Sequence, residues 1–263
     1  MASSNDLFQS VLRPGGLSFL FQPLLELCRQ GPVLYGIECF ARGPKGTPLE
    51  SADSLFEFAR ALGREPEIDR ACVLGALGGA ALLSSRISIN VHAATLSRDL
   101  DFVPWLLVEL DKRRFPSRRL TLDLVAPQLA PCTGALLGAL SQLRASGISI
   151  AVDDVGLNTN DFHGILTCRP DYVKLDRGLV HRSSHDEIAA AMLDSLARLS
   201  RTVGAQPMAE GVETVAELDS VAELGLCLVQ GYLFCPPLRL EELVRSELFA
   251  SDGTYYRPTS RAS

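Results

Sequence analysis

The sequence lacks several features that would assign it to a specialised class of protein. No apolar run reaches the roughly 18 residues that a membrane-spanning helix needs. The N-terminus has no basic region followed by a long apolar core, so a signal peptide is not predicted. The seven cysteines are odd in number and none forms a Cys-x-x-Cys pair, so neither a disulfide framework nor a zinc site is suggested. Scattered free cysteines favour a reducing, cytoplasmic setting.

Positive charge is also scarce. Lysine and arginine total 25 against 31 aspartates and glutamates, which gives a net charge of −6. Because sequence-independent binding to polymeric DNA or RNA needs a basic face, such a partner is not expected.

The 263 residues, 47% of them hydrophobic, fit one α/β barrel. We expect a flexible lead-in over 1–16, a barrel domain over 17–250 and a polar tail over 251–263. The short lead-in fits either a stand-alone protein or a piece of a longer sensor.

Short apolar segments alternate with helical patterns along the chain. We expect strands at 17–22, 33–40, 86–91, 119–125, 148–152, 172–175, 206–209 and 226–230. Helical spacing is found at 51–62, 68–83, 102–112, 128–145, 185–203, 214–224 and 240–249. This alternation predicts the α/β class and a (β/α)₈ barrel, with a doubly wound open sheet as the alternative.

The segment 148–176 carries the strongest chemical signal. Its first strand ends in two adjacent carboxylates, Asp153 and Asp154, and its second strand carries Lys174 and ends at Asp176. Adjacent carboxylates repel each other unless a cation lies between them. A helix cap followed by a turn is the structural alternative for this pair.

Other expected strands also end in polar side chains. These residues are Glu38, Asn90, Asp123, Glu210 with Glu213, and Gln230. In a barrel the carboxyl ends of the strands meet on one face, where the active site lies. The residues two positions earlier are small, as a crowded lumen beneath a site requires; they are Gly36, Ser88, Thr121 and Ala151.

Carboxylates and an amide, with no histidine or cysteine cluster, form a hard-oxygen set that suits Mg²⁺ or Mn²⁺. Asp153 could bridge two ions about 3.5–4 Å apart.

Taken singly, each residue also has a structural explanation. Glu38 could pair with Arg42, and Lys174 with Asp176. Glu210 and Glu213 could begin a helix, Asn90 could end a strand, and Gln230 could belong to a turn. One polar residue at nearly every strand end favours a site.

The same residues lie in motifs with a recognisable order and spacing. These are Phe21-Gln22-Pro23, Glu38-Cys39-Phe40-Ala41-Arg42, Ile89-Asn90-Val91, Val152-Asp153-Asp154-Val155-Gly156, Pro170-Asp171-Tyr172-Val173-Lys174-Leu175-Asp176, Ala209-Glu210-Gly211-Val212-Glu213-Thr214 and Val229-Gln230-Gly231-Tyr232-Leu233-Phe234. In this order they resemble the EAL-domain phosphodiesterases, which hydrolyse the bacterial second messenger cyclic di-GMP. The likeness extends from about Phe19 to about Leu248.

The resemblance implies a modified TIM barrel whose first strand is antiparallel to the others. It implies a metal set of Glu38, Asn90, Asp123, Asp153, Asp154 and Glu210 for two Mg²⁺ or Mn²⁺ ions. Lys174, Glu210 and Glu38 would be catalytic. Gln22, Arg42, Asp176, Glu213 and Gln230 would contact cyclic di-GMP. A homodimer or a protein partner is also compatible with the family, and the alternative function is a weak or inactive cyclic di-GMP receptor.

The chain departs from the family pattern at three places. The name motif Glu-Ala-Leu is Glu38-Cys39-Phe40, which keeps the glutamate. Position 123 is Asp where the family has Glu, which moves the carboxylate one methylene away from an ion. The loop 156–161 lacks the family sequence, and Ala126 stands where the family has a glutamate that anchors this loop. These changes predict slow hydrolysis with ligand binding retained.

Overall fold

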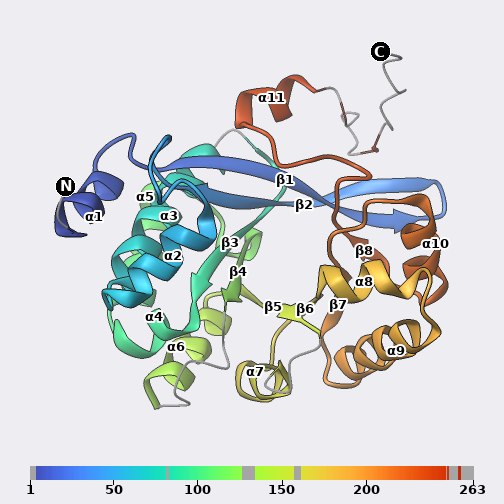
Figure 1. The fold of residues 1–263 in the computed structure, drawn as a ribbon. Coiled ribbons are helices and arrows are strands. Elements are labelled where there is room, and N and C mark those ends of the chain that lie inside the picture. The colour runs from blue at the N-terminus through green and yellow to red at the C-terminus, as the bar shows by residue number, and fades with distance from the viewer. Residues whose placement is uncertain are drawn as a thin grey trace.

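Eight strands close into one barrel in the computed structural model, and helices pack around its outside (Figure 1). The structure describes residues 4–80, 83–125, 134–156, 161–246, 248 and 254–255. The strands are β1 (Ser18–Cys28), β2 (Gly31–Arg42), β3 (Arg86–His92), β4 (Leu120–Val125), β5 (Ser149–Val155), β6 (Tyr172–Leu175), β7 (Gln206–Ala209) and β8 (Leu228–Val229). The helices are α1 (Ser4–Leu12), α2 (Ala52–Ala61), α3 (Glu65–Ala80), α4 (Ala93–Arg98), α5 (Phe102–Lys112), α6 (Gly134–Ala145), α7 (Asp161–Cys168), α8 (Arg177–Ser183), α9 (Glu187–Thr202), α10 (Val215–Glu223) and α11 (Leu240–Arg245), with a 3-10 turn at Ser117–Arg119.

The strand directions confirm the predicted barrel and exclude the open sheet. Strands β2 to β8 pair in parallel with their neighbours in chain order. Strand β1 is antiparallel to both β2 and β8 and closes the barrel between them. The carboxyl ends of β2 to β8 therefore lie on one face, which is the geometry that gathers strand-end side chains into a site.

Strand β1 is longer than predicted, because Pro23 does not end it. Pro23 pairs with Ile37 of β2, and β1 continues to Cys28. On its other side β1 pairs with β8 only at Leu25 and Glu26. A proline lacks an N–H donor, so a sheet accepts it where one side of the strand needs no ladder hydrogen bond.

The lead-in predicted to be flexible contains helix α1 over residues 4–12. Phe8 and Val11 of this helix are buried against α2 and α3 residues such as Leu55 and Ile68. The guanidinium of Arg64 lies 3.8 Å from the centroid of the Phe8 ring. The expectation overlooked the apolar i, i+3 pair of Phe8 and Val11, which gives the helix a face to bury.

The expected polar tail is described only at residues 254 and 255. Tyr255 is buried, and its hydroxyl donates to the carbonyl of Phe234 at 2.7 Å. None of the helices in the described part of the chain is long and apolar enough to cross a membrane.

Small residues line the barrel lumen beneath the carboxyl-end face, as the two-residue spacing predicted. They are Gly36, Ser88, Thr121 and Ala151. An apolar cluster at the lumen contains Leu24, Met208 and Leu228. Tyr35 and Tyr172 share a hydrogen bond of 2.5 Å there. Small side chains leave room above this packed floor for longer polar side chains from the strand ends.

Candidate active site

Lys174 on β6 lies at the centre of the carboxyl-end face and is 2% exposed. Its ammonium contacts carboxylates from four other strands or strand ends: Glu210 at 2.7 Å, Asp153 at 3.0 Å, and Glu38 and Asp123 at 3.1 Å each. An ammonium has three N–H donors, so it cannot serve four carboxylates fully. Among the described residues no hydrogen bond reaches Asp123 Oδ2 or Asp153 Oδ1, which touch Lys174 only as ionic contacts.

The buried negative charge shifts the protonation equilibria of this cluster. Burial raises the pKa of Glu38 to about 7, although Lys174 opposes the shift. Burial likewise raises the pKa of Asp123, and it raises the pKa of Glu210 well above its ordinary value. Burial alone would lower the pKa of Lys174, but the surrounding carboxylates, Asp123 foremost, raise it well above its ordinary value. The cluster therefore contains more negative charge than one lysine compensates.

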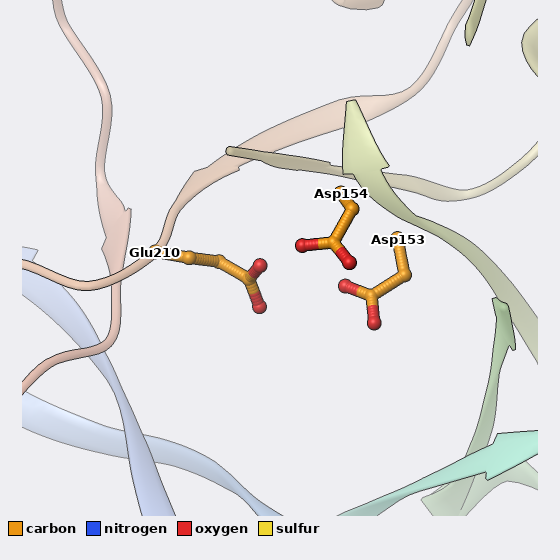
Figure 2. Close-up of side chains that lie close together, drawn as sticks. All are labelled: Asp153, Asp154 and Glu210. Atoms are coloured by element: carbon orange, nitrogen blue, oxygen red, sulfur yellow. The ribbon is translucent and has the colours of Figure 1, made fainter. Parts of the chain in front are cut away.

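Three carboxylates of this face converge closely enough to hold a cation. Asp153, Asp154 and Glu210 each place an oxygen within 4.8 Å of the others. Figure 2 shows the two aspartates extending from the end of β5 toward Glu210, which follows β7. Within the described residues this is the cluster of acidic, histidine or cysteine side chains with metal-site spacing. Its all-oxygen composition suits Mg²⁺ or Mn²⁺.

The backbone of β5 is distorted at this point. The pairing of β5 with β6 shifts register between Val152 and Val155, and Asp154 has a φ of 54°. A left-handed conformation is costly for a non-glycine residue and occurs often at functional sites. The irregularity turns Asp153 and Asp154 toward the same opening, whereas a regular strand would alternate them.

Asn90 and Glu38 border this group from β3 and β2. Asn90 Nδ2 donates to Glu38 Oε1 at 2.8 Å, while Asn90 Oδ1 is buried and has no hydrogen-bond partner among the described residues. An unpaired buried carbonyl oxygen costs free energy unless a donor or a cation meets it. This amide oxygen therefore fits a metal-binding role.

Asp123 lies deeper than the three converging carboxylates. It is fully buried on β4, accepts a hydrogen bond from Ser88 Oγ at 2.6 Å and contacts Lys174. Asp123 lines the lumen beneath the face but is absent from the group that places its oxygens within 4.8 Å of one another. The side chain of Asp123, one methylene shorter than a glutamate, is thus bound to Ser88 and Lys174.

A pocket of about 320 Å³ opens above the cluster; we call it the mouth pocket. Its acidic wall contains Glu38, Asp153, Asp154, Glu210 and Glu213, and the rest of the lining includes Gln22, Phe40, Arg42, Lys174, Arg177, Gly211, Gln230, Gly231, Tyr232 and Pro237. An acidic wall with the spacing to hold a cation, together with arginines at the same opening, suits a phosphate ester.

Gln22 and Gln230 form a buried pair in the mouth pocket. Gln230 Nε2 donates to Gln22 Oε1 at 3.1 Å, and Gln22 Nε2 donates to the carbonyl of Cys235 at 2.9 Å. Each amide keeps hydrogen-bonding capacity beyond these contacts. The pair is thereby held in position to meet a polar ligand.

The pairing of Glu38 with Arg42, which was the structural alternative to a site role, is not among the ion pairs of the described residues, because Glu38 is bound to Lys174. Arg42 Nη1 donates to the carbonyl of Ala41 at 2.9 Å. Glu213 forms an ion pair of 2.7 Å with Arg177. Both arginines line the mouth pocket.

Among the residues predicted to contact the ligand, Asp176 is the one that does not line the mouth pocket. It is the N-cap of α8, and its carboxylate accepts a hydrogen bond from the backbone N–H of Leu179 at 3.0 Å. A Cβ on Gly156 would come within 2.6 Å of the Asp176 Cβ, so the turn after β5 requires glycine there. The suggested pairing of Asp176 with Lys174 is likewise not among the ion pairs that Lys174 forms with described residues.

Arg177, Tyr232 and Phe40 line the mouth pocket without having been predicted as site residues. Arg177 was missed because helix α8, which it begins, was not predicted. A signal for it existed, since Asp176 is a good N-cap directly after a strand. Gly211 has a φ of 66°, and a Cβ there would collide with the side chain of Arg177, so this glycine leaves space for the arginine.

Ala126 and residues 157–160 lie outside the described residues. The expectation that the altered loop slows hydrolysis while ligand binding is retained therefore stays a prediction.

Residues 4–237 match the family model described as "EAL domain". The bifunctional diguanylate cyclase/cyclic di-GMP phosphodiesterase MucR of Pseudomonas aeruginosa is 34% identical over 112 residues, which are 43% of this chain and 16% of MucR. The cyclic di-GMP phosphodiesterase PdeL of Escherichia coli is 31% identical over 135 residues, 51% of this chain and 37% of PdeL. The chain spans well under half the length of these relatives.

Solved structures agree on the fold. The EAL enzyme Bd1971 with cAMP and cyclic di-GMP superposes with a TM-score of 0.83 at 21% identity, covering 92% of this chain and 67% of that one. The MucR phosphodiesterase in complex with c-di-GMP superposes with a TM-score of 0.79 at 24% identity, covering 91% of this chain and 99% of that one. With the family model matched over nearly the whole barrel, the chain belongs to the EAL domain family, which includes cyclic di-GMP phosphodiesterases.

Proposed function

We propose that this chain is a metal-dependent phosphodiesterase that hydrolyses cyclic di-GMP to linear pGpG. The observation that carries the proposal is the convergence of Asp153, Asp154 and Glu210 beside Lys174 at the floor of the mouth pocket. One phosphodiester of the ring would lie over this floor. Arg42 and Arg177 are available at the same opening for phosphate oxygens.

Two divalent ions fit the donor set. Asp153, Asp154, Glu210, Asn90 and Glu38 would hold them, with Asp123 acting from below through Lys174. Bound ions of this kind lower the pKa of a bound water and offset charge on the phosphate and the leaving oxygen.

The residues of the chain would divide the remaining work. A water oxygen forms a bond to phosphorus, the bond from phosphorus to the 3′ oxygen breaks, and that oxygen gains a proton. The Lys174 ammonium would orient the water and stabilise negative charge on the phosphate. Glu210, 2.7 Å from Lys174, would accept the proton of the water, and Glu38 would hold Lys174 in place.

The remaining contacts would position the ligand. Gln22 and Gln230 offer amide groups, Arg42 offers a bidentate fork, and Glu213 offers a carboxylate held by Arg177. Asp176 would act indirectly by capping the helix that begins with Arg177.

One observation favours a second candidate, a receptor that binds cyclic di-GMP with little or no hydrolysis. Asp123 is bound to Ser88 and Lys174 and does not join the converging carboxylates. A weaker metal set would reduce turnover more than ligand binding.

One experiment separates the two candidates. The purified chain is incubated with cyclic di-GMP and Mn²⁺, products are separated by chromatography, and ligand binding is measured by calorimetry with Ca²⁺ in place of Mn²⁺. Formation of pGpG that is lost in Asp153→Asn supports the phosphodiesterase. Binding without product supports the receptor, and absence of both contradicts the proposed ligand.

A further inference from the structure

The segment that follows β8 folds into a tight turn over residues 230–235, which we call the β8 turn. The backbone N–H groups of Phe234 and Cys235 both donate to the carbonyl of Gly231, each at 3.2 Å. A Cβ on Gly231 would lie 1.9 Å from the carbonyl oxygen of Val212, so the turn packs directly against the segment after β7. Backbone contacts therefore hold the first half of the turn.

The second half of the turn holds the amide pair of the mouth pocket. Gln22 Nε2 donates to the carbonyl of Cys235 at 2.9 Å, and Gln230 Nε2 donates to Gln22 Oε1 at 3.1 Å. The two glutamine side chains are buried, with 5% and 3% exposure. The orientation of both amides thus depends on where the carbonyl of Cys235 lies.

Tyr255 contacts the β8 turn directly before its last residue. Its hydroxyl donates to the buried carbonyl of Phe234 at 2.7 Å, and the two rings pack edge to face with centroids 5.8 Å apart. The backbone N–H of Tyr255 donates to the carbonyl of Pro32 at 3.0 Å, and Thr254 forms a β-bridge with Val33. Tyr255 is thus anchored on β2 and supports the turn without lining the mouth pocket itself.

The hydrogen bond of Tyr255 and that of Gln22 are linked through the backbone. The carbonyls of Phe234 and Cys235 belong to consecutive peptide planes, and only two soft dihedrals separate such planes. Fixing the first carbonyl therefore limits where the second one points. Without the tyrosine hydroxyl the buried carbonyl of Phe234 loses its donor, which favours a shift of the turn toward another donor. Such a shift moves the acceptor of Gln22 and loosens the amide pair.

We propose that Tyr255 is a positioning residue for ligand binding, which acts through the β8 turn on the amide pair of Gln22 and Gln230. The inference rests on the proposed function, because that function assigns the two amides to cyclic di-GMP. It adds a residue outside the pocket lining, in a segment that the sequence indicated only as a polar tail. Tyr255 is not part of the carboxylate cluster that would hold the ions, so its effect falls on binding rather than on the chemical step.

The test compares Tyr255→Phe with a matched control, Tyr35→Phe. Each change removes one hydroxyl that takes part in a hydrogen bond, and the hydroxyl of Tyr35 is bonded to that of Tyr172 at 2.5 Å in the barrel lumen. Tyr35 does not line the mouth pocket. The affinity for cyclic di-GMP is measured by calorimetry with Ca²⁺, and kcat and KM are measured with Mn²⁺. All measurements are made at a temperature at which urea denaturation shows both variants to be folded.

Tyr255→Phe should raise the Kd and the KM for cyclic di-GMP by about 3- to 10-fold, the effect of losing one neutral hydrogen bond, and leave kcat unchanged. Tyr35→Phe should leave all three constants unchanged. A second readout comes from the amide pair. In a chain that already carries Gln22→Ala, Tyr255→Phe should weaken binding no further, because the side chain through which Tyr255 acts is gone.

The contrary results separate the inference from the proposed function. If the unaltered chain neither binds nor hydrolyses cyclic di-GMP, the proposed function fails and the inference fails with it. If the chain binds cyclic di-GMP but Tyr255→Phe leaves the Kd unchanged, the inference alone is refuted. An equal loss of affinity in Tyr35→Phe, or a full additional loss on top of Gln22→Ala, also refutes the inference alone, because a merely structural contact would produce it.

Discussion

Replacing Lys174 with methionine removes the one buried cation that compensates four carboxylates among the described residues. Methionine keeps most of the length and volume of the side chain, so the change is mainly electrostatic. Breaking a buried ion pair by deleting one partner costs about 3–5 kcal/mol. Lys174 is 2% exposed, and Glu38 and Asp123 are no more exposed, so solvent screens these contacts little. We expect Lys174→Met to lower the free energy of unfolding by an amount in this range at pH 8 without divalent ions.

The pH dependence follows from Glu38. Its pKa in the folded chain is raised from 4.5 to about 7, so the folded state binds the proton more tightly than the unfolded state. Such a group stabilises the fold below pH 4.5 and loses that contribution as pH rises through about 7. A shift of this size corresponds to roughly 3 kcal/mol. Without the Lys174 charge the pKa of Glu38 rises further, so the loss in Lys174→Met should be smaller at pH 5 than at pH 8.

The assay is urea denaturation at pH 5 and pH 8, in EDTA and in millimolar Mn²⁺. Mn²⁺ bound among the carboxylates should restore part of the lost stability, since it binds only the folded chain. Lys112→Met is the matched control, because Lys112 is 62% exposed and its surface pair with Glu109 is worth at most about 1 kcal/mol. Equal stability of Lys174→Met and the unaltered chain at pH 8 in EDTA would refute the electrostatic reasoning.

Four further outcomes are expected. Asp153→Asn should abolish pGpG formation, since it removes a carboxylate that both ions would share; unchanged turnover measured by chromatography contradicts the two-metal site. Arg42→Ala should weaken cyclic di-GMP binding by about 1.5–3 kcal/mol in calorimetry, and equal affinity would assign Arg42 a structural role. Asp176→Ala should cost about 1 kcal/mol of stability through the lost helix cap; a loss of ligand affinity with no loss of stability would instead make it a ligand contact. Replacing 156–161 together with Ala126 by the family sequence should raise turnover and lower the Mn²⁺ requirement, whereas rapid turnover of the native chain in low-millimolar Mg²⁺ would show that the loop needs no repair.

The sequence by itself determined the strand-end chemistry of this protein. Each parallel strand ends on the same face of a barrel, so a polar residue at the end of a strand lies near the others whatever the details of packing. Asp153, Asp154, Glu210 and Lys174 follow this rule. The small lumen residues, such as Ser88, were also predictable. Side chains alternate along a strand with a period of two, so the residue two positions before a strand-end site residue faces the same lumen.

Local signals at the borders of elements were less informative. Helix α1 depends on burying Phe8 and Val11 against distant helices, and β1 passes through Pro23 because of how β8 pairs beside it. Asp176 and Lys174 are close in sequence, yet Asp176 caps the N-terminus of α8, whereas Lys174 lies at the barrel centre and pairs with Glu38.

Only the tertiary structure decided which groups meet at the site. Lys174 and Glu38 are 136 residues apart in sequence, and Gln22 and Gln230 are 208 apart. Local sequence patterns carry no distances between side chains so widely separated. Closing the barrel brings such side chains into a low-dielectric centre, where burial raises the pKa of Glu38. The sequence therefore predicted which residue types stand at the strand ends. Their contacts and the net charge of the cluster depend on the folded structure.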